Sequence, residues 1–341
     1  MRPSPGEAAG QAQRGKLLVN MSAANRIIEL LYDRREGYFS HDELAAASGL
    51  TRRAICEALD ELGGRGHKIQ NSPVRGVRLT RPVRADSHLI ERRLGTARLG
   101  RAVLCFEEVD STSDVAFDCA RQQNSDGVVI VAEFQRRGRG RRGRSWLSPP
   151  SANVLMSVLL VAPGRLMPHD ALTVAAGLGV AEGIEQATGL RCELKWPNDV
   201  LLDGGKVSGV LVELRRVNRR QCAVVGIGIN VNASPSAEEV DSPATDLAGH
   251  SGEPVERIEV IREVLRRLDA WAGRIVSGRL EQLHAAWLAR CAMIGQRVIV
   301  NCAGTRYAGR VLDVSPLEGL ALSCDDGRRV YLPAESSILI D

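Results

Sequence analysis

The sequence predicts an α+β protein built from three parts. Short helical patterns followed by a basic hairpin lie between residues 25 and 79. Apolar strands and helices follow in the middle of the chain, and short β-patterns with turns fill residues 293–340. A length of 341 residues suggests two or three domains. We therefore expect a disordered tail and three domains, with boundaries at 1–21, 22–84, 85–291 and 292–341.

Composition and charge fit a globular protein of a reducing compartment. Hydrophobic residues make up 44% of the chain and charged residues 25%. The net charge of +4 is too small to identify a nucleic-acid partner, but it is compatible with one basic module on a near-neutral body. The eight cysteines include no C-x-x-C pair and no histidine at zinc-ligand spacing. No apolar run reaches transmembrane length and no signal peptide is recognisable, so we expect a cytoplasmic protein with no membrane partner.

The first residues lack any periodic apolar pattern. Residues 1–16 are rich in Gly, Ala, Pro, Gln and Arg, which predicts disorder. Met21 stands just before the first helical pattern, so both Met1 and Met21 stay open as the start of the chain.

The N-terminal module carries clear helix-start signals. Ser40 and Glu43 form an S-x-x-E capping box, and Thr51 caps a further helix after a turn at Gly49. A hairpin is expected over residues 69–79, where a proline and a glycine interrupt the β-pattern.

This module resembles a winged helix-turn-helix. Its last helix would enter a major groove, and its hairpin would lie along phosphates. The side chains expected to contact DNA are Arg52, Arg53, Glu57, Arg75 and Arg78. Two alternatives use the same topology, namely a protein-interaction module and a domain that no longer binds DNA.

The most unusual stretch runs from Gln135 to Trp146, with the sequence QRRGRGRRGRSW. Glycine lets a backbone approach a ligand closely, arginine binds carboxylate and phosphate bidentately, and an indole offers a flat face for stacking. One interpretation is a solvated Arg/Gly segment that is disordered or binds nucleic acid. The other is a loop that folds over a small anionic ligand.

Three further stretches of the central domain carry candidate ligand groups. The hydroxyls of Ser111 and Thr112 follow a strand over 103–109, where they would cap the next helix or bind a polar ligand. An Asp-Gly-Gly turn at 203–205 predicts a hairpin with Lys206 at the start of the returning strand. Alternating glycines in residues 225–229 suggest close approach by a ligand or another backbone.

Two other segments predict packing rather than chemistry. A helix over residues 170–188 carries small side chains, which we expect to permit close packing on the sheet; these are Ala175, Ala176, Gly179 and Gly183. The short β-patterns of residues 293–340 predict a small barrel.

Four motifs in this order, GRGRRGRSW, KWPND, GGKVSGVLVEL and GIGINVN, resemble those of biotin–protein ligases. With its N-terminal module, the chain is similar to the bifunctional kind that is also the biotin operon repressor. The resemblance runs from about Asn25 to the C-terminus and favours the ligand-loop interpretation. It implies a mixed-sheet core like that of class II synthetases and an SH3-like C-terminal barrel.

The resemblance also implies a reaction. The family activates biotin with ATP as biotinoyl-5′-AMP and passes the acyl group to a lysine of a biotin carboxyl carrier protein, here expected to be that of acetyl-CoA carboxylase. Because an anion must attack the α-phosphorus of a polyanion, fixed cations are the main requirement. Mg²⁺ is expected with ATP, although the sequence identifies no ligands for it. In the family the adenylate orders the central loop and promotes a homodimer that binds operator DNA.

Twelve residues acquire expected roles from their motif positions. The catalytic residues would be Arg141 and Lys206. Biotin would be bound by Ser111, Thr112, Ser113, Gln135, Arg139, Gly140, Arg141 and Lys206. The adenylate would be bound by Trp146, Asn230, Lys195 and Asp199. Ser113 departs from the family, which commonly has Asn there, and its shorter hydroxyl would reach the ureido ring through water.

Two alternatives compete with the two-function protein. The first is a lipoate–protein ligase on the same fold, whose usual motifs are absent here. The second is a DNA-binding regulator that senses biotin without ligating it, although the intact Arg/Gly loop and Lys206 favour a ligase.

Overall fold

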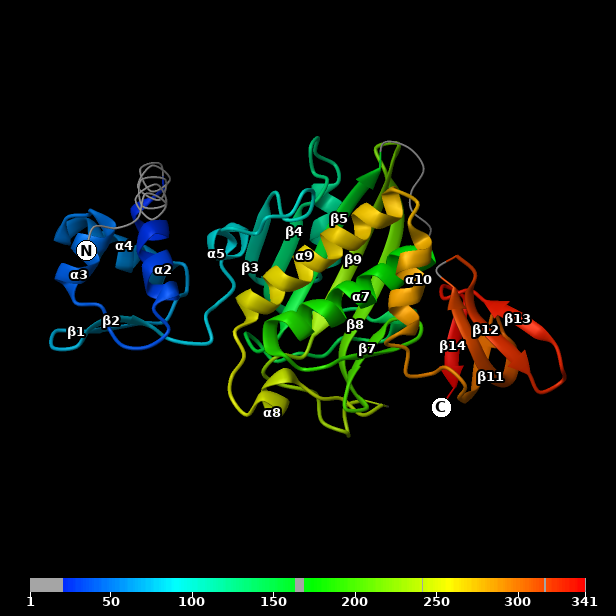
Figure 1. The fold of residues 1–341 in the computed structure, drawn as a ribbon. Helices are drawn as coiled ribbons and strands as arrows, with labels where there is room; N and C mark the ends of the chain where they lie inside the picture. The colour runs from blue at the N-terminus through cyan, green and yellow to red at the C-terminus, as the bar shows by residue number, and fades with distance from the viewer. Residues whose placement is uncertain (1–20, 163–168, 241, 316, 341) are drawn as a thin grey trace, which may run out of the picture. The chain divides into compact units, whose positions relative to one another are not determined.

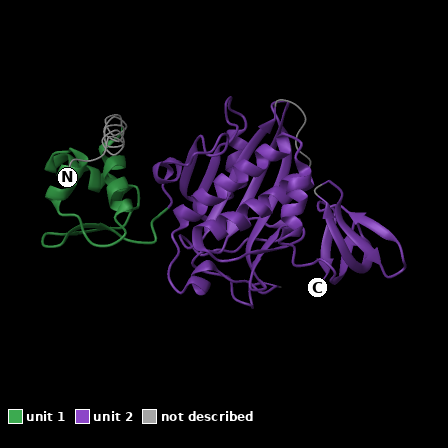
Figure 2. Ribbon diagram, in the orientation of Figure 1, with its two compact units in different colours: residues 1–84 green, residues 85–341 purple. Residues whose placement is uncertain are grey.

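The computed structural model describes residues 21–162, 169–240, 242–315 and 317–340. All but the last residue of the expected disordered tail therefore lies outside the described residues. The chain forms two compact units that divide at Arg84 (Figure 2). Nowhere in the described ranges is a helix both long enough and apolar enough to cross a membrane.

The described part of unit 1, residues 21–84, contains three helices and a two-stranded hairpin (Figure 1). Their bounds are α2 (Ala23–Asp33), α3 (His41–Ser48), α4 (Arg52–Gly64), β1 (Ile69–Ser72) and β2 (Gly76–Leu79). The helices meet through a fully buried apolar core, which includes Ile27, Ile28, Leu44, Ile55 and Leu62. The helix positions and the hairpin agree with those expected from the sequence.

Local signals explain where these helices begin and end. The Ser40 hydroxyl accepts from the Glu43 amide, and the Glu43 carboxylate accepts from the Ser40 amide at 2.7 Å, which confirms the capping box. Gly49 ends α3 in the left-handed region at φ 69°, and the Thr51 hydroxyl then caps α4. A helix, a tight turn and a second helix follow directly from these caps.

Unit 2 contains a seven-stranded sheet with the order β3-β4-β5-β9-β8-β7-β6. Its strands are β3 (Val103–Val109), β4 (Val129–Gln135), β5 (Val154–Ala162), β6 (Glu193–Lys195), β7 (Asp199–Leu202), β8 (Gly205–Val217) and β9 (Arg220–Ile229). Only β3 and β4 run parallel, and the other neighbours are antiparallel, so the sheet is mixed. The predicted hairpin at residues 203–205 is confirmed, and Lys206 lies at the start of β8.

Six helices accompany this sheet within the described part of unit 2. They are α5 (Ser87–Glu91), α6 (Thr112–Cys119), α7 (His169–Thr188), α8 (Leu247–Ser251), α9 (Arg257–Val276) and α10 (Leu280–Leu288). Helices α7 and α9 lie side by side across one face of the sheet (Figure 1). Helix α6 packs through Ala116 and Phe117 into a buried cluster with Ile130, Leu159 and Val224 from three strands.

We expected the glycines of α7 to permit close packing on the sheet, and this prediction was wrong about the element that packs against them. A Cβ on Gly183 would lie 2.6 Å from backbone atoms of Val264, and one on Gly179 would lie 3.0 Å from the Leu268 Cα. Both contacts are with α9, so these glycines bring two helices together rather than a helix and the sheet.

The C-terminal end of unit 2 forms a second, antiparallel sheet with the order β13-β12-β11-β10-β14. Its strands are β10 (Arg297–Cys302), β11 (Thr305–Ser315), β12 (Gly319–Cys324), β13 (Arg329–Leu332) and β14 (Ser337–Ile340). A bulge between Val311 and Asp313 shifts the register of β11 against β12. Strand β14 pairs with β10 and lies at the edge of the sheet.

Candidate functional site

A cavity of about 550 Å³ opens in unit 2, and the twelve residues assigned by motif position all line it. They come from the start of α6, the end of β4 and the loop that follows it, the β6–β8 hairpins and the residue after β9. The set comprises Ser111, Thr112, Ser113, Gln135, Arg139, Gly140, Arg141, Trp146, Lys195, Asp199, Lys206 and Asn230. Segments more than a hundred residues apart in the chain therefore contribute to one site.

One end of the cavity is rich in hydroxyl groups. The amide and hydroxyl of Thr112 donate to Gln135 Oε1 at 2.8 and 3.0 Å. Ser157 Oγ, on β5, lies 2.8 Å from the Thr112 hydroxyl and 3.1 Å from the Ser113 hydroxyl. Ser111 occupies the N-cap position of α6, but its side chain makes no capping hydrogen bond. The capping interpretation is therefore wrong for Ser111. Thr112 and Ser113 are instead connected through Ser157 in a buried chain of hydrogen bonds.

Ser157 was missed in the sequence, because a serine inside an apolar strand carries no motif of its own. It is fully buried and connects the two hydroxyls of α6 to the sheet. Gly226 faces the same place, since a Cβ there would lie 3.1 Å from Ser113 Oγ.

The Arg/Gly loop is folded onto itself. Gly140 N donates to Arg144 O at 2.7 Å, and Trp146 N donates to Gly138 O at 3.0 Å. A short 3₁₀ turn over Arg141–Gly143 lies between these bonds. The interpretation of this loop as a structureless Arg/Gly segment is therefore wrong.

The loop ends with the Trp146 indole against the sheet. A Cβ on Gly228 would clash with the indole, and one on Gly209 would lie 3.1 Å from it. Lys206 Nζ lies 5.8 Å from the ring centroid, within cation–π range. The alternating glycines thus admit an aromatic side chain, where the sequence suggested a ligand or a backbone. The indole Nε1 is buried and has no hydrogen-bond partner among the residues that the structure describes.

Lys206 and Asp199 form an ion pair across the β7–β8 hairpin. Their Nζ and Oδ1 atoms lie 2.7 Å apart, and both side chains are about a third exposed or less. Near them, Asn230 Nδ2 donates to Thr245 O at 3.1 Å, while its buried Oδ1 has no hydrogen-bond partner within the described ranges. A buried amide oxygen without a partner can accept from a ligand, because leaving it unsatisfied is costly.

Arg141 reaches the C-terminal segment of the chain. Its guanidinium donates to the carbonyl oxygens of Ala334 and Ser337, and Asn198 Oδ1 lies 3.5 Å away. Burial, followed by the neighbouring charge of Arg142, lowers the pKa of Arg141. Within the described residues its partners are neutral oxygens rather than a carboxylate. The segment around Ser337 also lines the cavity, and no sequence motif indicated that it would.

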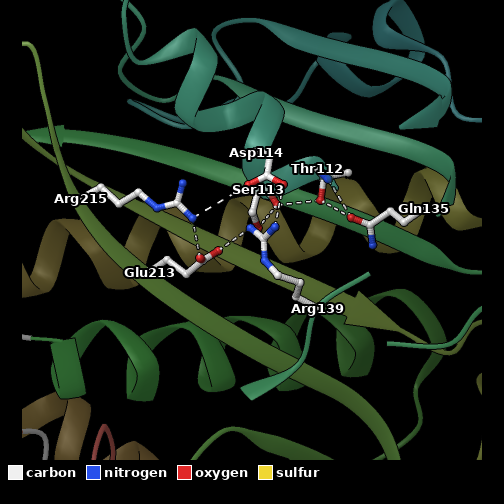
Figure 3. Close-up of polar contacts among 8 residues, drawn as sticks. Thr112, Ser113, Asp114, Gln135, Arg139, Glu213 and Arg215 are labelled. Carbon is white, nitrogen blue, oxygen red and sulfur yellow. Dashed lines mark hydrogen bonds and ion pairs between the residues drawn. The ribbon is translucent and has the colours of Figure 1, made fainter. Parts of the chain in front are cut away.

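Arg139 has the opposite surroundings (Figure 3). It donates to Asp114 Oδ2 at 2.6 Å and to Glu213 Oε2 at 3.1 Å. Those contacts raise the pKa of Arg139, mainly through the hydrogen bond to Asp114, and the same bond lowers the pKa of Asp114. Asp114 and Glu213 are two further residues of the site that the sequence did not identify.

The described residues contain no group of three or more His, Cys, Asp or Glu side chains arranged to hold a metal ion. No residue is therefore assigned to Mg²⁺.

The residues expected to contact DNA lie in unit 1. Arg52, Arg53 and Glu57 lie on the exposed side of α4, where Arg53 pairs with Glu57 at 2.8 Å and Arg52 with Asp42 at 3.4 Å. Arg75 occupies the hairpin turn, and Arg78 on β2 donates to Gln70 at 2.9 Å.

Comparisons with known proteins point to one family. Residues 105–230 match the Biotin/lipoate A/B protein ligase family. The chain is 33% identical to the biotin–[acetyl-CoA-carboxylase] ligase of Mycobacterium tuberculosis, over 74% of this chain and 91% of that protein. It is 28% identical to the bifunctional ligase/repressor BirA of Bacillus subtilis, over 89% of this chain and 95% of that protein.

A solved structure gives the same result. The biotin protein ligase of Aquifex aeolicus, determined in complex with biotin and ATP, is 30% identical to this chain. Its TM-score is 0.59, and the match covers 70% of this chain and 100% of the other.

Proposed function

The chain belongs to the biotin protein ligase family, and from this premise we propose that its unit 2 cavity converts biotin and ATP into biotinoyl-5′-AMP and then transfers the biotinoyl group to a lysine of a carrier protein. The observation that carries the proposal is the convergence of all twelve assigned residues on one cavity. The acceptor is the biotin carboxyl carrier protein of acetyl-CoA carboxylase, because relatives of this chain are named for that activity.

The two ends of the cavity suit the two substrates. The hydroxyl end with Ser111, Thr112 and Ser113 would bind the ureido ring of biotin, which offers both donors and acceptors. The end with Trp146 and Asn230 would bind adenine, by stacking on the indole and through the unsatisfied amide oxygen. Lys195 and Asp199 line this second end.

Cationic side chains line the same cavity, and we assign them to the charge that develops during the reaction. In the first step a biotin carboxylate oxygen bonds to the α-phosphorus and pyrophosphate leaves. Arg141 and Lys206 would stabilise the additional negative charge at phosphorus, while Gln135, Arg139 and Gly140 hold the biotin side of the loop. In the second step the carrier lysine attacks the acyl carbon and AMP leaves with the bonding electrons. Mg²⁺, when bound with ATP, supplies further charge neutralisation on the phosphates.

A transfer assay tests this proposal directly. The purified full chain is incubated with a carrier domain, Mg-ATP and either biotin or lipoate, and modification is scored by mass. We expect transfer of biotin alone. Transfer of lipoate would favour the lipoate-type ligase, and biotin binding without transfer would favour a regulator that only senses biotin.

Unit 1 supports a second function, biotin-responsive repression through operator DNA. Three helices followed by a basic hairpin support the proposal of a winged helix-turn-helix, and a relative is named a bifunctional ligase/repressor. In this proposal the adenylate promotes a homodimer that binds DNA, and the C-terminal sheet acts as an SH3-like domain that assists substrate handling.

DNA binding is tested on the region upstream of the organism's biotin genes, with biotin and Mg-ATP present or absent. Ligands should tighten binding, and Arg53→Ala should reduce the salt slope by about one unit. Arg35→Ala, an exposed change outside α4 and the hairpin, is the charge-matched control. Biotin transfer without DNA binding would leave a ligase whose N-terminal module is no longer a repressor.

A further inference from the structure

Arg139 is held by two carboxylates that belong to the chain itself. Its Nη1 donates to Asp114 at the start of α6, and its Nη2 donates to Glu213 on β8 (Figure 3). One guanidinium thus connects a helix and a strand to the loop that lies between them. Charge-assisted hydrogen bonds of this kind are shorter and stronger than neutral ones.

A second arginine balances the charge of this cluster. Arg215 donates to Glu213 Oε1 at 3.0 Å and lies 3.9 Å from Asp114 Oδ1. Its guanidinium stacks over the Phe117 ring at 4.0 Å, which fixes its position. Two cations and two anions make the cluster neutral, so neither carboxylate is left uncompensated when Arg139 is held there.

Backbone contacts link Arg139 to the rest of the loop. The backbones of Arg139 and Ser145 form an isolated antiparallel β-bridge across the loop. The hydrogen bond from Trp146 N to Gly138 O joins the two ends of the same loop. Hydrogen bonds within a loop reduce the number of conformations that the loop can adopt. Holding one side chain therefore restricts residues 138–146 together.

We propose that Asp114 and Glu213 are positioning residues, which hold Arg139 and order loop 138–146 before biotin and ATP bind. The two carboxylates reduce the entropy that the substrates would otherwise have to remove from the loop. The apparent affinity for biotin then depends on the fraction of molecules whose loop is already ordered. The kinetic part of this proposal rests on the proposed adenylation of biotin, whereas the ordering of the loop does not.

Limited trypsin digestion of the full chain without substrates tests the ordering. Trypsin cleaves after arginine, and mass spectrometry counts cleavage after Arg141, Arg142 and Arg144. Asp114→Asn should accelerate cleavage at these sites about three- to tenfold, since a half-exposed charged pair contributes modestly. Asp118→Asn is the matched control, because Asp118 lies on the same helix and pairs with exposed Arg121 at 3.5 Å. Biotin with Mg-ATP should protect all three proteins equally.

Biotin-dependent pyrophosphate exchange tests the kinetic consequence. Asp114→Asn and Glu213→Gln should each raise KM for biotin about three- to tenfold while kcat changes less than twofold. Asp114→Glu, which keeps the carboxylate, should recover most of the loss. A purely structural defect would instead lower the melting temperature and kcat together, and the conservative change would not restore KM selectively.

Two results would overturn the proposal. Unchanged trypsin cleavage in Asp114→Asn would show that the loop does not depend on the pair. Faster cleavage with a lower KM for biotin would show that Asp114 competes with the substrate for Arg139 instead of positioning it. If the wild-type protein shows no biotin-dependent exchange, the proposed function fails, but the trypsin result still decides whether the carboxylates order the loop.

Discussion

The two sides of loop 138–146 hold their arginines in different ways. Arg139 donates to two carboxylates, and its pKa is raised. Arg141, two residues later, donates to backbone carbonyl oxygens, and its pKa is lowered by burial. Identical side chains in one short loop therefore have opposite electrostatic surroundings.

This difference suggests that Arg139 holds the loop in place, whereas Arg141 is available to bind an anion. The charge of Arg139 is already neutralised, so a new anion gains little there unless it replaces a carboxylate. The Arg141 guanidinium is half-buried and donates to neutral oxygens, and the attraction of Asp199 and Asp170 only partly offsets the cost of burying its charge. An anion placed beside Arg141 would offset part of that cost, so we expect this side of the loop to be the better place to stabilise phosphate in the transition state.

The largest expected effect is on Arg141. Arg141→Ala should lower the adenylation rate by about 10²- to 10³-fold, as for the loss of one transition-state donor. Arg139→Ala should cost less, about tenfold, because its charge is neutralised by the protein. Biotin-dependent pyrophosphate exchange measures both, and Arg137→Ala, an exposed change outside the cavity, is the control. Equal losses of rate at the two positions would show that the different surroundings of Arg139 and Arg141 have no functional consequence. A near-normal adenylation rate for Arg141→Ala would contradict its catalytic role.

A smaller effect is expected where the Trp146 indole lies on the sheet. Gly228→Ala places a methyl group against the indole and should raise KM for ATP about tenfold, by displacing a ring from a tightly packed position. KM for biotin should change much less. Gly273→Ala is the matched control, because a Cβ there meets no atom within 4 Å. An unchanged KM for ATP, with unchanged tryptophan fluorescence, would contradict the assigned position of adenine.

The smallest effect is a pH dependence confined to the Arg139 side. The hydrogen bond from Arg139 holds the pKa of Asp114 below its usual value of 3.8. A lowered pKa means that the stabilisation is fully present above pH 3.8 and is lost as pH falls through the lowered value. Hydrogen exchange of residues 138–146, corrected for intrinsic rates, should accelerate about two- to fivefold below that pH.

Strand β5 supplies the internal reference for that measurement, because its residues are almost all buried. The Asp114→Asn protein should show fast loop exchange already at neutral pH and a weaker pH dependence. Loop exchange that is independent of pH in the wild-type protein would show that the carbonyl contacts of Arg141 alone order the loop.

Short-range signals made much of the fold predictable. Ser40 and Glu43 are three residues apart, and their reciprocal bonds begin α3 as expected. The Asp-Gly-Gly turn placed Lys206 correctly, because a two-strand hairpin is determined by neighbours in sequence. The helix glycines were assigned to the wrong partner, since a small side chain indicates close packing without identifying what packs.

The residues of the site were predictable as a set because their motifs are local and specific, from Ser111–Ser113 to Asn230. The elements, the family resemblance and the set of side chains that line one cavity could all be predicted from the sequence. The hydrogen-bond and ion-pair partners of each charged side chain became clear only from the tertiary structure. Arg139 finds its partners 25 and 74 residues away, and Arg141 finds Ser337 at a separation of 196 residues. Coulombic and hydrogen-bond partners depend on distance in space, so the two arginines of one motif acquire different surroundings only when the chain has folded.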